Sequence, residues 1–204
     1  MGEAKVYTGY GDLESGNCYK VYLVLHLLGL PHRWVKVDVV KQETRTPAFL
    51  AKNPTGRVPL LEIEPGVYLS ESNAIIAYLA HGTPLFPDDR LLQARVLQWM
   101  SFEQYEHEPT IASSRYYLHF LKAPEQYAAQ LAAKRPGGLA ALGVMERHLA
   151  HQPYFVGERF TIADVALYAY THVADEGGFD LGDFPAIRAW LARVPDRPGF
   201  KPMR

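Results

Sequence analysis

The chain has 204 residues, of which 48% are hydrophobic, and this is enough for one large domain or two small ones with a proper core. Its 21 Lys and Arg nearly balance its 22 Asp and Glu, so the net charge of -1 gives no support for nucleic-acid binding. The single cysteine, Cys18, excludes an intrachain disulfide framework, and we expect a reducing, cytoplasmic setting. No apolar signal core is evident near Met1, and apolar runs such as 21–28 are too short to span a bilayer, so no membrane association is expected.

The first eighty residues alternate between strand and helix patterns. We expect first a strand at 5–7, a loop at 8–15, and a helix that is capped by Ser15 or Asn17 and ends at Gly29. A strand at 34–39 and a helical turn at 47–51 follow. The last elements are a hairpin of strands around Val58 and Val67 and a helix at 73–79. The first two strands flank a helix and should therefore be parallel. This order of elements indicates a thioredoxin-like α/β domain.

Strand patterns nearly stop after a breaker-rich stretch that ends at Pro87. The second half reads as all-α, with helices at 91–121, 127–149, 162–173 and 184–194. Thr161 and Asp164 form a variant of the capping box that starts the third of these helices. His148 and His151 are interpreted as a solvated helix end. We expect a first domain at 1–82, a linker at 83–87 and a helical domain at 88–204.

Two turns in the first half have the features of a binding site for a small peptide. Pro59 has no N–H and opens a β-prone run, so the backbone groups of Val58 are left for a ligand, and a cis bond here would turn them outward. An extended ligand could pair with Val58 as an added strand. Ser72 begins a helix whose N-terminus attracts a carboxylate, while Glu71 suits an ammonium. Together the two turns offer partners to both halves of an amino-acid zwitterion and to the backbone beside it.

In this order, the motifs of the chain resemble the soluble glutathione S-transferase family over essentially the whole length. The segment 99–109 is most similar to bacterial members with a theta- or beta-like N-terminus. The resemblance rests on Ser15-Gly16-Asn17-Cys18, Val58-Pro59, Glu71-Ser72, the linker Pro84–Pro87 and the box Thr161–Asp164. It implies a thioredoxin-like glutathione-binding half, a helical half that shapes a co-substrate pocket, a homodimer, and a role in detoxification.

The resemblance also implies glutathione as co-substrate, bound at the Val58-Pro59 backbone and at Glu71 and Ser72, with its thiol at the start of the first helix. We expect the Ser15 hydroxyl to donate a hydrogen bond to the sulfur anion, while N–H groups around Asn17 and Cys18 and the helix dipole add positive potential. A thiol with a pKa of about 8.5 must be lowered by about two units to be largely ionised at neutral pH, which is worth roughly 2.7 kcal/mol. The thiolate would then attack a small electrophile or peroxide.

Other side chains are alternatives for contact with the sulfur. Cys18 lies at a helix N-terminus, where its own pKa would fall, and it could form a mixed disulfide with glutathione; its other interpretation is a small apolar packing residue. Tyr7 resembles a strand-end tyrosine that acts on the sulfur in other classes, although such a residue more often serves packing. Tyr10 would lie on a loop that is longer than expected before Ser15, and it could reach the site instead.

Several further residues are candidates for the edges of the site. Arg57 and Lys41 flank the expected groove and could pair with the glycyl carboxylate of glutathione, or simply be solvated. Positions that could line the co-substrate cleft or reach a partner subunit are Gln104, His107, Glu108, Arg115 and Tyr116. No metal is expected, because His107 and Glu108 lack a third ligand at helical spacing.

Two other functions compete with thiolate transfer to an electrophile. One is a glutathione-dependent reduction of disulfides or peroxides that runs through Cys18. The other is a non-catalytic binding or regulatory module, because this fold is reused in transcription- and translation-associated proteins. The presence of Ser15, Glu71 and Ser72 favours the transferase.

Overall fold

The computed structural model describes residues 5–203, and these divide into two compact units. The first unit comprises residues 5–81 together with the C-terminal segment 197–203, and the second comprises residues 82–196. This differs from the expectation that 88–204 form one helical domain. The hydroxyl of Tyr19 donates a hydrogen bond of 2.7 Å to the carbonyl of Lys201, which ties the C-terminal segment to the first unit.

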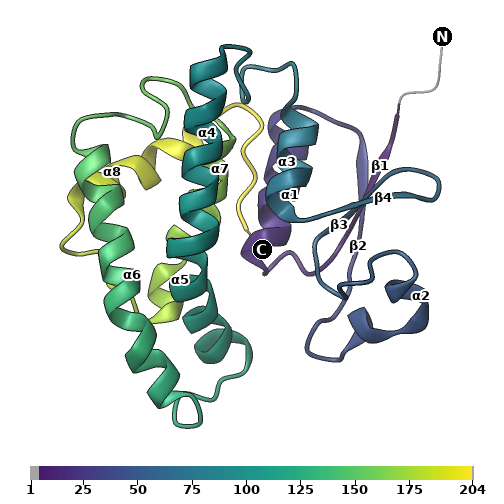
Figure 1. Ribbon diagram of the computed structural model, residues 1–204, viewed down its shortest axis with the longest axis horizontal. Coiled ribbons are helices and arrows are strands. Elements are labelled where there is room, and N and C mark those ends of the chain that lie inside the picture. The colour runs from purple at the N-terminus through teal and green to yellow at the C-terminus, as the bar shows by residue number, and fades with distance from the viewer. Residues whose placement is uncertain (1–4, 204) are drawn as a thin grey trace. The chain divides into compact units, whose positions relative to one another are not determined.

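The first unit is built on a four-stranded sheet with the order β2-β1-β3-β4. Its strands are β1 (Tyr7–Tyr10), β2 (His32–Val35), β3 (Leu60–Glu64) and β4 (Val67–Ser70). β1 and β2 are parallel, whereas β3 is antiparallel to both β1 and β4. The helices α1 (Gly16–Leu27) and α3 (Ser72–Ala80) lie side by side on one face of the sheet, and the short α2 (Pro47–Leu50) lies on the other side (Figure 1). The thioredoxin-like prediction is therefore confirmed.

The first two strands differ in position from the sequence expectation. β1 extends to Tyr10, so the expected loop at 8–15 was wrong for its first three residues, and β2 begins two residues earlier than expected. Gly9 is a residue type that usually indicates a loop, which explains the wrong prediction for β1. Inside the sheet a glycine is required at this position, because a Cβ there would lie 2.3 Å from the ring of Trp34. The true connection from Tyr10 to Ser15 is consequently short.

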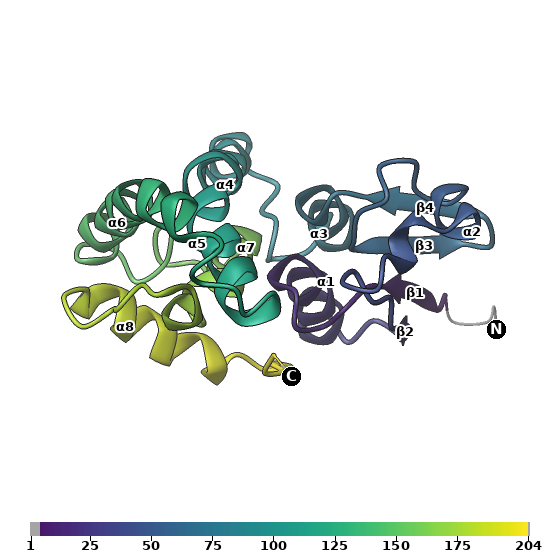
Figure 2. The same ribbon diagram turned by 90° about the horizontal axis from the view of Figure 1, so that it is seen from below.

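The second unit is all-α in its regular elements, as predicted. Its α-helices are α4 (Arg90–Phe102), α5 (Glu108–Arg115), α6 (Ala128–Leu149), α7 (Ile162–Thr171) and α8 (Pro185–Arg193). α7 packs against α4 and α5, beside which it is seen in Figure 2, and every one of its residues is buried. Among residues 5–203, no helix combines the length and apolarity needed to cross a membrane.

The long helix expected at 91–121 contains two π-helical turns. They span Glu103–His107 and Tyr116–Phe120 and connect α4 to α5 and α5 to the following loop. Pro109, in the first turn of α5, has no N–H to donate to the preceding turn, and a wider turn just before it accommodates this loss. The helix therefore continues through Pro109 with altered hydrogen bonding.

The capping box predicted at Thr161 and Asp164 is confirmed. The N–H of Thr161 donates to Asp164 Oδ2 at 2.9 Å, and Asp164 Oδ1 accepts from the N–H of Phe155 at 3.2 Å and from Trp190 Nε1 at 3.1 Å. One fully buried carboxyl group therefore joins the start of α7 to α8 and to the preceding loop. Burial raises the pKa of Asp164 to about 7, although these hydrogen bonds act in the opposite direction.

We predict that Asp164→Ala lowers the free energy of unfolding by at least about 3 kcal/mol at pH 5, because several buried N–H donors lose their acceptor. The folded-state pKa of Asp164 lies above the unfolded value, so its contribution is fully present below about pH 4 and is lost as the pH rises through about 7. The difference between wild type and variant should therefore be roughly 2 to 3 kcal/mol smaller at pH 8 than at pH 5. Urea unfolding at both pH values measures it.

Asp183→Ala is the matched control, because Asp183 is exposed and its side chain has no hydrogen bond in the described part of the chain. Its free energy of unfolding should stay within about 0.5 kcal/mol of wild type at both pH values. An Asp164→Ala deficit that is equal at pH 5 and pH 8, or larger at pH 8, would contradict the raised pKa of Asp164.

Candidate functional site

The strand directions of the first unit bring three chain segments to one edge of its sheet. β1 and β4 run in the same direction, because each is antiparallel to β3. The helices that follow them, α1 and α3, therefore start at the same edge, and the turn that leads into β3 lies there as well. The register agrees, since Leu60 at the start of β3 pairs with both Tyr10 and Ser70 at the ends of their strands.

The N-terminal ends of α1 and α3 are joined by one hydrogen bond. The hydroxyl of Ser72 donates to Asn17 Oδ1 at 3.0 Å, and Ser72 is buried. Neither helix start, at Ser15 for α1 or at Glu71 for α3, has a side-chain cap. Because each helix N-terminus carries roughly half a positive charge, this edge is suited to an anionic ligand.

Glu71 stands at the start of α3 in an unusual backbone conformation. Its φ of 70° and ψ of 111° are uncommon for a residue other than glycine. The residue is exposed, whereas its neighbour Ser72 faces the interior. The turn therefore presents a carboxylate to solvent directly beside the uncapped N-terminus of α3, as a site for both halves of a zwitterion requires.

The Val58–Pro59 peptide bond at the entry to β3 is cis, as the sequence analysis considered. Sheet pairing of this strand begins only at Leu60. Within residues 5–203, neither the N–H nor the carbonyl of Val58 has a hydrogen-bond partner. Both backbone groups are thus available to an extended peptide at the edge where α1 and α3 begin.

Asn53 fixes the turn that precedes Val58, a role that the sequence analysis did not assign. It is 2% exposed, its Nδ2 donates to the carbonyl of Arg57 at 2.8 Å, and its Oδ1 accepts from the N–H of Thr55 at 3.2 Å. Arg45 Nη1 also donates to the carbonyl of Thr55 at 3.2 Å. An Asn before Pro is a turn signal of this kind, and the side-chain hydrogen bonds of Asn53 to the backbone of Arg57 and Thr55 hold the residue next to Val58 in place.

Ser15 and Cys18 occupy different environments at the start of α1. Cys18 is fully buried, and burial raises the pKa of its thiol to about 12, although hydrogen bonding to Ser15 and to the Asp12 backbone acts in the opposite direction. Gly11 lies directly against Cys18, because a Cβ at Gly11 would be 2.4 Å from the Cys18 sulfur. Cys18 therefore has the surroundings of a small packing residue, and Ser15 remains half-buried at the helix start.

The two tyrosines considered for the sulfur contact are engaged elsewhere. Tyr10 lies on β1 rather than on a loop, and its side chain packs with Phe49 and Leu60 on the face that α2 covers. Its hydroxyl donates to Glu62 Oε2 at 2.7 Å, so the expectation that Tyr10 could reach the start of α1 is wrong. The hydroxyl of Tyr7 lies close to Tyr78.

The two basic residues expected beside the groove, Lys41 and Arg57, differ in whether they already have a charged partner. Lys41 is exposed, and its Nζ lies 3.4 Å from Asp38 Oδ2, a surface pair that contributes little. Arg57 is exposed, and its guanidinium has no partner among the described residues. Arg57 therefore remains available immediately before Val58.

In the second unit, a hollow of about 320 Å³ lies along α5. It is lined by Glu108, Pro109, Ala112, Ser113, Tyr116, Tyr117 and Tyr170. Of the expected co-substrate residues, Glu108 and Tyr116 line it, whereas Gln104, His107 and Arg115 do not.

Packing explains why His107 and Arg115 are absent from this hollow. His107 is fully buried with its Nε2 at 2.9 Å from Thr171 Oγ1, and Arg115 is buried against Glu176 at 2.5 Å. Among residues 5–203, no cluster of three His, Cys, Asp or Glu side chains is arranged to hold a metal ion.

Solved structures resemble the chain over nearly its full length. The crystal structure of glutathione S-transferase from Pseudomonas fluorescens Pf-5 is 52% identical, with a TM-score of 0.94, and the alignment covers 97% of this chain and 98% of that chain. The structure of Ure2p in complex with glutathione is 26% identical, with a TM-score of 0.86 and coverage of 98% of both chains.

Curated relatives have different names. The disulfide-bond oxidoreductase YfcG of Escherichia coli K12 is 28% identical over 89% of this chain and 87% of its own length. Protein URE2 of Eremothecium gossypii is 29% identical over 94% of this chain, which spans 66% of the length of that protein. These names do not by themselves select one reaction.

Family models match both halves of the chain. The model for the glutathione S-transferase N-terminal domain matches residues 14–81, and the model for the glutathione S-transferase C-terminal domain matches residues 102–198. The first match contains the joined helix starts and the Val58–Pro59 turn, and the second contains the hollow along α5. The chain therefore belongs to the glutathione S-transferase family.

Proposed function

We propose that the protein is a glutathione transferase that ionises the thiol of glutathione and directs it at a small electrophile. One observation carries the proposal: the Ser72–Asn17 hydrogen bond joins two uncapped helix N-termini beside the unpaired backbone of Val58. A tripeptide with a zwitterionic end and a thiol fits this arrangement. It needs an anion site, which the helix N-termini provide, and backbone pairing, which Val58 provides; its ammonium group needs a carboxylate, which Glu71 carries.

Each part of glutathione is assigned to one feature of the site. The γ-glutamyl carboxylate takes the N-terminus of α3 at Ser72, and its ammonium pairs with the exposed carboxylate of Glu71. The cysteinyl backbone pairs with the N–H and carbonyl of Val58. The glycyl carboxylate pairs with Arg57, which is exposed and whose guanidinium has no hydrogen bond or ion pair with any residue among 5–203. Lys41 is a weaker candidate for the same carboxylate, because it already faces Asp38.

Ser15 is the residue that we assign to the sulfur. Its hydroxyl stands at the uncapped start of α1, where a donated hydrogen bond and the helix dipole both favour a thiolate over a thiol. Asn17 Oδ1 accepts the hydrogen bond from Ser72, so we assign Asn17 the role of holding the starts of α1 and α3 together. Cys18 is not given a chemical step, because a fully buried thiol with a pKa raised to about 12 supplies no thiolate near neutral pH.

The reaction is the formation of a carbon–sulfur bond. The thiolate donates an electron pair to an electrophilic carbon, and in a substitution the leaving group departs with the electrons of its bond. In an addition to a carbon–carbon double bond, the π bond breaks as the carbon–sulfur bond forms, and its electron pair moves to the neighbouring carbon, which then takes a proton from water. The half-buried groups of Glu108 and Tyr117 in the hollow along α5 are assigned to the co-substrate, together with Tyr116.

We further propose that the protein acts in the cytoplasm as a homodimer with a role in detoxification. A single, buried, free cysteine is compatible with a reducing compartment. Large apolar side chains are exposed within each unit, Val67 and Tyr78 in the first and Leu91 and Leu97 in the second, and a second subunit would remove such side chains from water.

We predict that Ser15→Ala raises the pKa of the bound glutathione thiol by about two units and lowers kcat/KM with 1-chloro-2,4-dinitrobenzene about 100-fold. The hydroxyl stabilises the thiolate, and alanine removes only that group. Ultraviolet titration of the thiolate in the binary complex and steady-state conjugation kinetics measure the two effects.

Cys18→Ala is the comparison variant, and it should keep kcat/KM within about threefold of wild type because the buried thiol is assigned no chemical step. The opposite pattern, in which Cys18→Ala abolishes activity and Ser15→Ala does not, would favour the disulfide or peroxide reductase. Glutathione binding without conjugation or reduction of any tested substrate would favour the non-catalytic module.

We predict that Glu71→Gln weakens glutathione binding by about tenfold to 100-fold, because the ammonium group loses a charged acceptor while the side chain keeps its size. Isothermal titration calorimetry measures the dissociation constant. Glu158→Gln, at an exposed glutamate of the second unit, is the control and should bind as wild type does. Equal affinities for Glu71→Gln and wild type would contradict the assignment of the ammonium group.

A further inference from the structure

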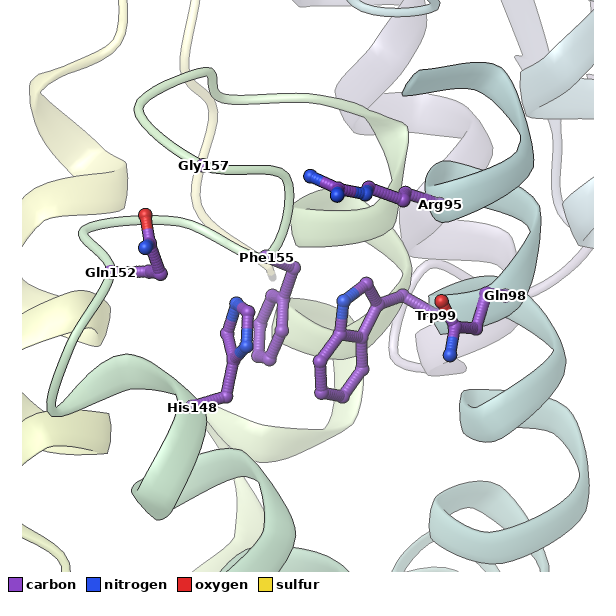
Figure 3. A pocket seen from close by; sticks show the side chains of 7 residues that line it. All are labelled: Arg95, Gln98, Trp99, His148, Gln152, Phe155 and Gly157. Carbon is purple, nitrogen blue, oxygen red and sulfur yellow. The ribbon is translucent and has the colours of Figure 1, made fainter. Parts of the chain in front are cut away.

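A second hollow, of about 270 Å³, lies entirely within the second unit, between α4 and the loop that follows α6 (Figure 3). Arg95, Gln98 and Trp99 line it from α4, and His148, Gln152 and Phe155 line it from the end of α6 and the loop. None of these residues lines the hollow along α5. Ligand pockets usually measure about 300–1,000 Å³. This hollow is slightly smaller than that range, so it suits a small molecule of one or two rings.

Three aromatic rings form the wall and base of this hollow. The ring of Trp99 lies 4.7 Å from those of both His148 and Phe155, centroid to centroid, and the His148 and Phe155 rings are nearly parallel at 8°. Phe155 is buried, whereas Trp99 and His148 are half-buried and keep accessible ring surface. The surface is therefore apolar and suited to a planar ring.

His148 is held in place within this wall. Its Nε2 lies 3.2 Å from the carbonyl of Tyr154, and since a carbonyl only accepts, Nε2 carries the proton and donates. The interpretation of His148 as a solvated helix end is thus wrong, because the loop at 153–155 folds back over it. The ring is fixed by a hydrogen bond and by its two aromatic neighbours, which makes the wall preformed.

Two N–H donors face the hollow without an acceptor. The guanidinium of Arg95 has no hydrogen bond or ion pair among the described residues, and neither does the indole N–H of Trp99. In Figure 3 the indole nitrogen lies on the edge of Trp99 that is turned toward the Arg95 guanidinium. No residue that lines the hollow carries a carboxylate, so its charge is that of Arg95.

From this arrangement we infer that the hollow is a binding site for a small planar aromatic carboxylate. The carboxylate accepts from the Arg95 guanidinium and the Trp99 indole N–H, and the ring of the ligand lies against Trp99 and His148. A small hydrated anion would leave the aromatic wall uncovered, a neutral aromatic would leave Arg95 unpaired, and a cation would meet the charge of Arg95. The site is separate from the residues assigned to glutathione and its co-substrate.

Direct binding of 1-naphthoate to the full-length protein tests this inference. Calorimetry and saturation-transfer NMR should show one saturable site, and 1-naphthalenemethanol and cyclohexanecarboxylate should each bind at least about tenfold more weakly, because one lacks the charge and the other the planar ring. Arg95→Gln should weaken 1-naphthoate binding at least about tenfold. Trp99→Phe, which keeps an aromatic ring and removes the N–H, should weaken it about threefold to tenfold.

Arg188→Gln is the matched control, because Arg188 is also exposed on a helix and does not line the hollow. It should bind 1-naphthoate within about twofold of wild type, as should wild type in excess S-hexylglutathione, which occupies the proposed glutathione site. The inference is overturned if 1-naphthoate does not bind, if Arg95→Gln binds it as tightly as wild type, or if S-hexylglutathione displaces it.

Discussion

The hydrogen bond from Ser72 to Asn17 is the constraint on which the candidate site depends. It fixes the distance between the starts of α1 and α3, so that two helix dipoles act on one small region. The strand directions make this possible, because β1 and β4 run the same way and the helices after them must start at the same edge. The opposite direction of β3 brings Val58 to that edge as well. Sheet topology, rather than any single catalytic side chain, therefore assembles the ligand site.

The site separates binding from chemistry. In the proposed function, the backbone of Val58 and the helix start at Ser72 are assigned to binding, and the turn before Val58 is held by the buried Asn53. One hydroxyl, that of Ser15, is assigned to the sulfur, while the neighbouring Cys18 is enclosed by Gly11. In the helical unit, the buried carboxylate of Asp164 joins the start of α7 to Trp190 of α8.

The sequence predicted the thioredoxin-like half, the all-α half and the capping box, because these follow from periodicity, breakers and cap residues. It misplaced β1, because Gly9 reads as a loop residue and its need for contact with Trp34 is a tertiary effect. It also kept Tyr10 as an alternative for the sulfur contact, and that alternative depended on the same strand boundary. Burial of His107 and Arg115, the aromatic setting of His148 and the position of residues 197–203 all depend on packing between segments that are distant in sequence, which local patterns do not encode.

The most direct measurement of the central claim is a crystal structure of the protein with glutathione bound. The account predicts the γ-glutamyl end at Glu71 and Ser72, the cysteinyl N–H and carbonyl paired with the backbone of Val58, and the sulfur within hydrogen-bonding distance of the Ser15 hydroxyl. Glutathione bound away from the starts of α1 and α3, or joined through its sulfur to Cys18, would contradict it.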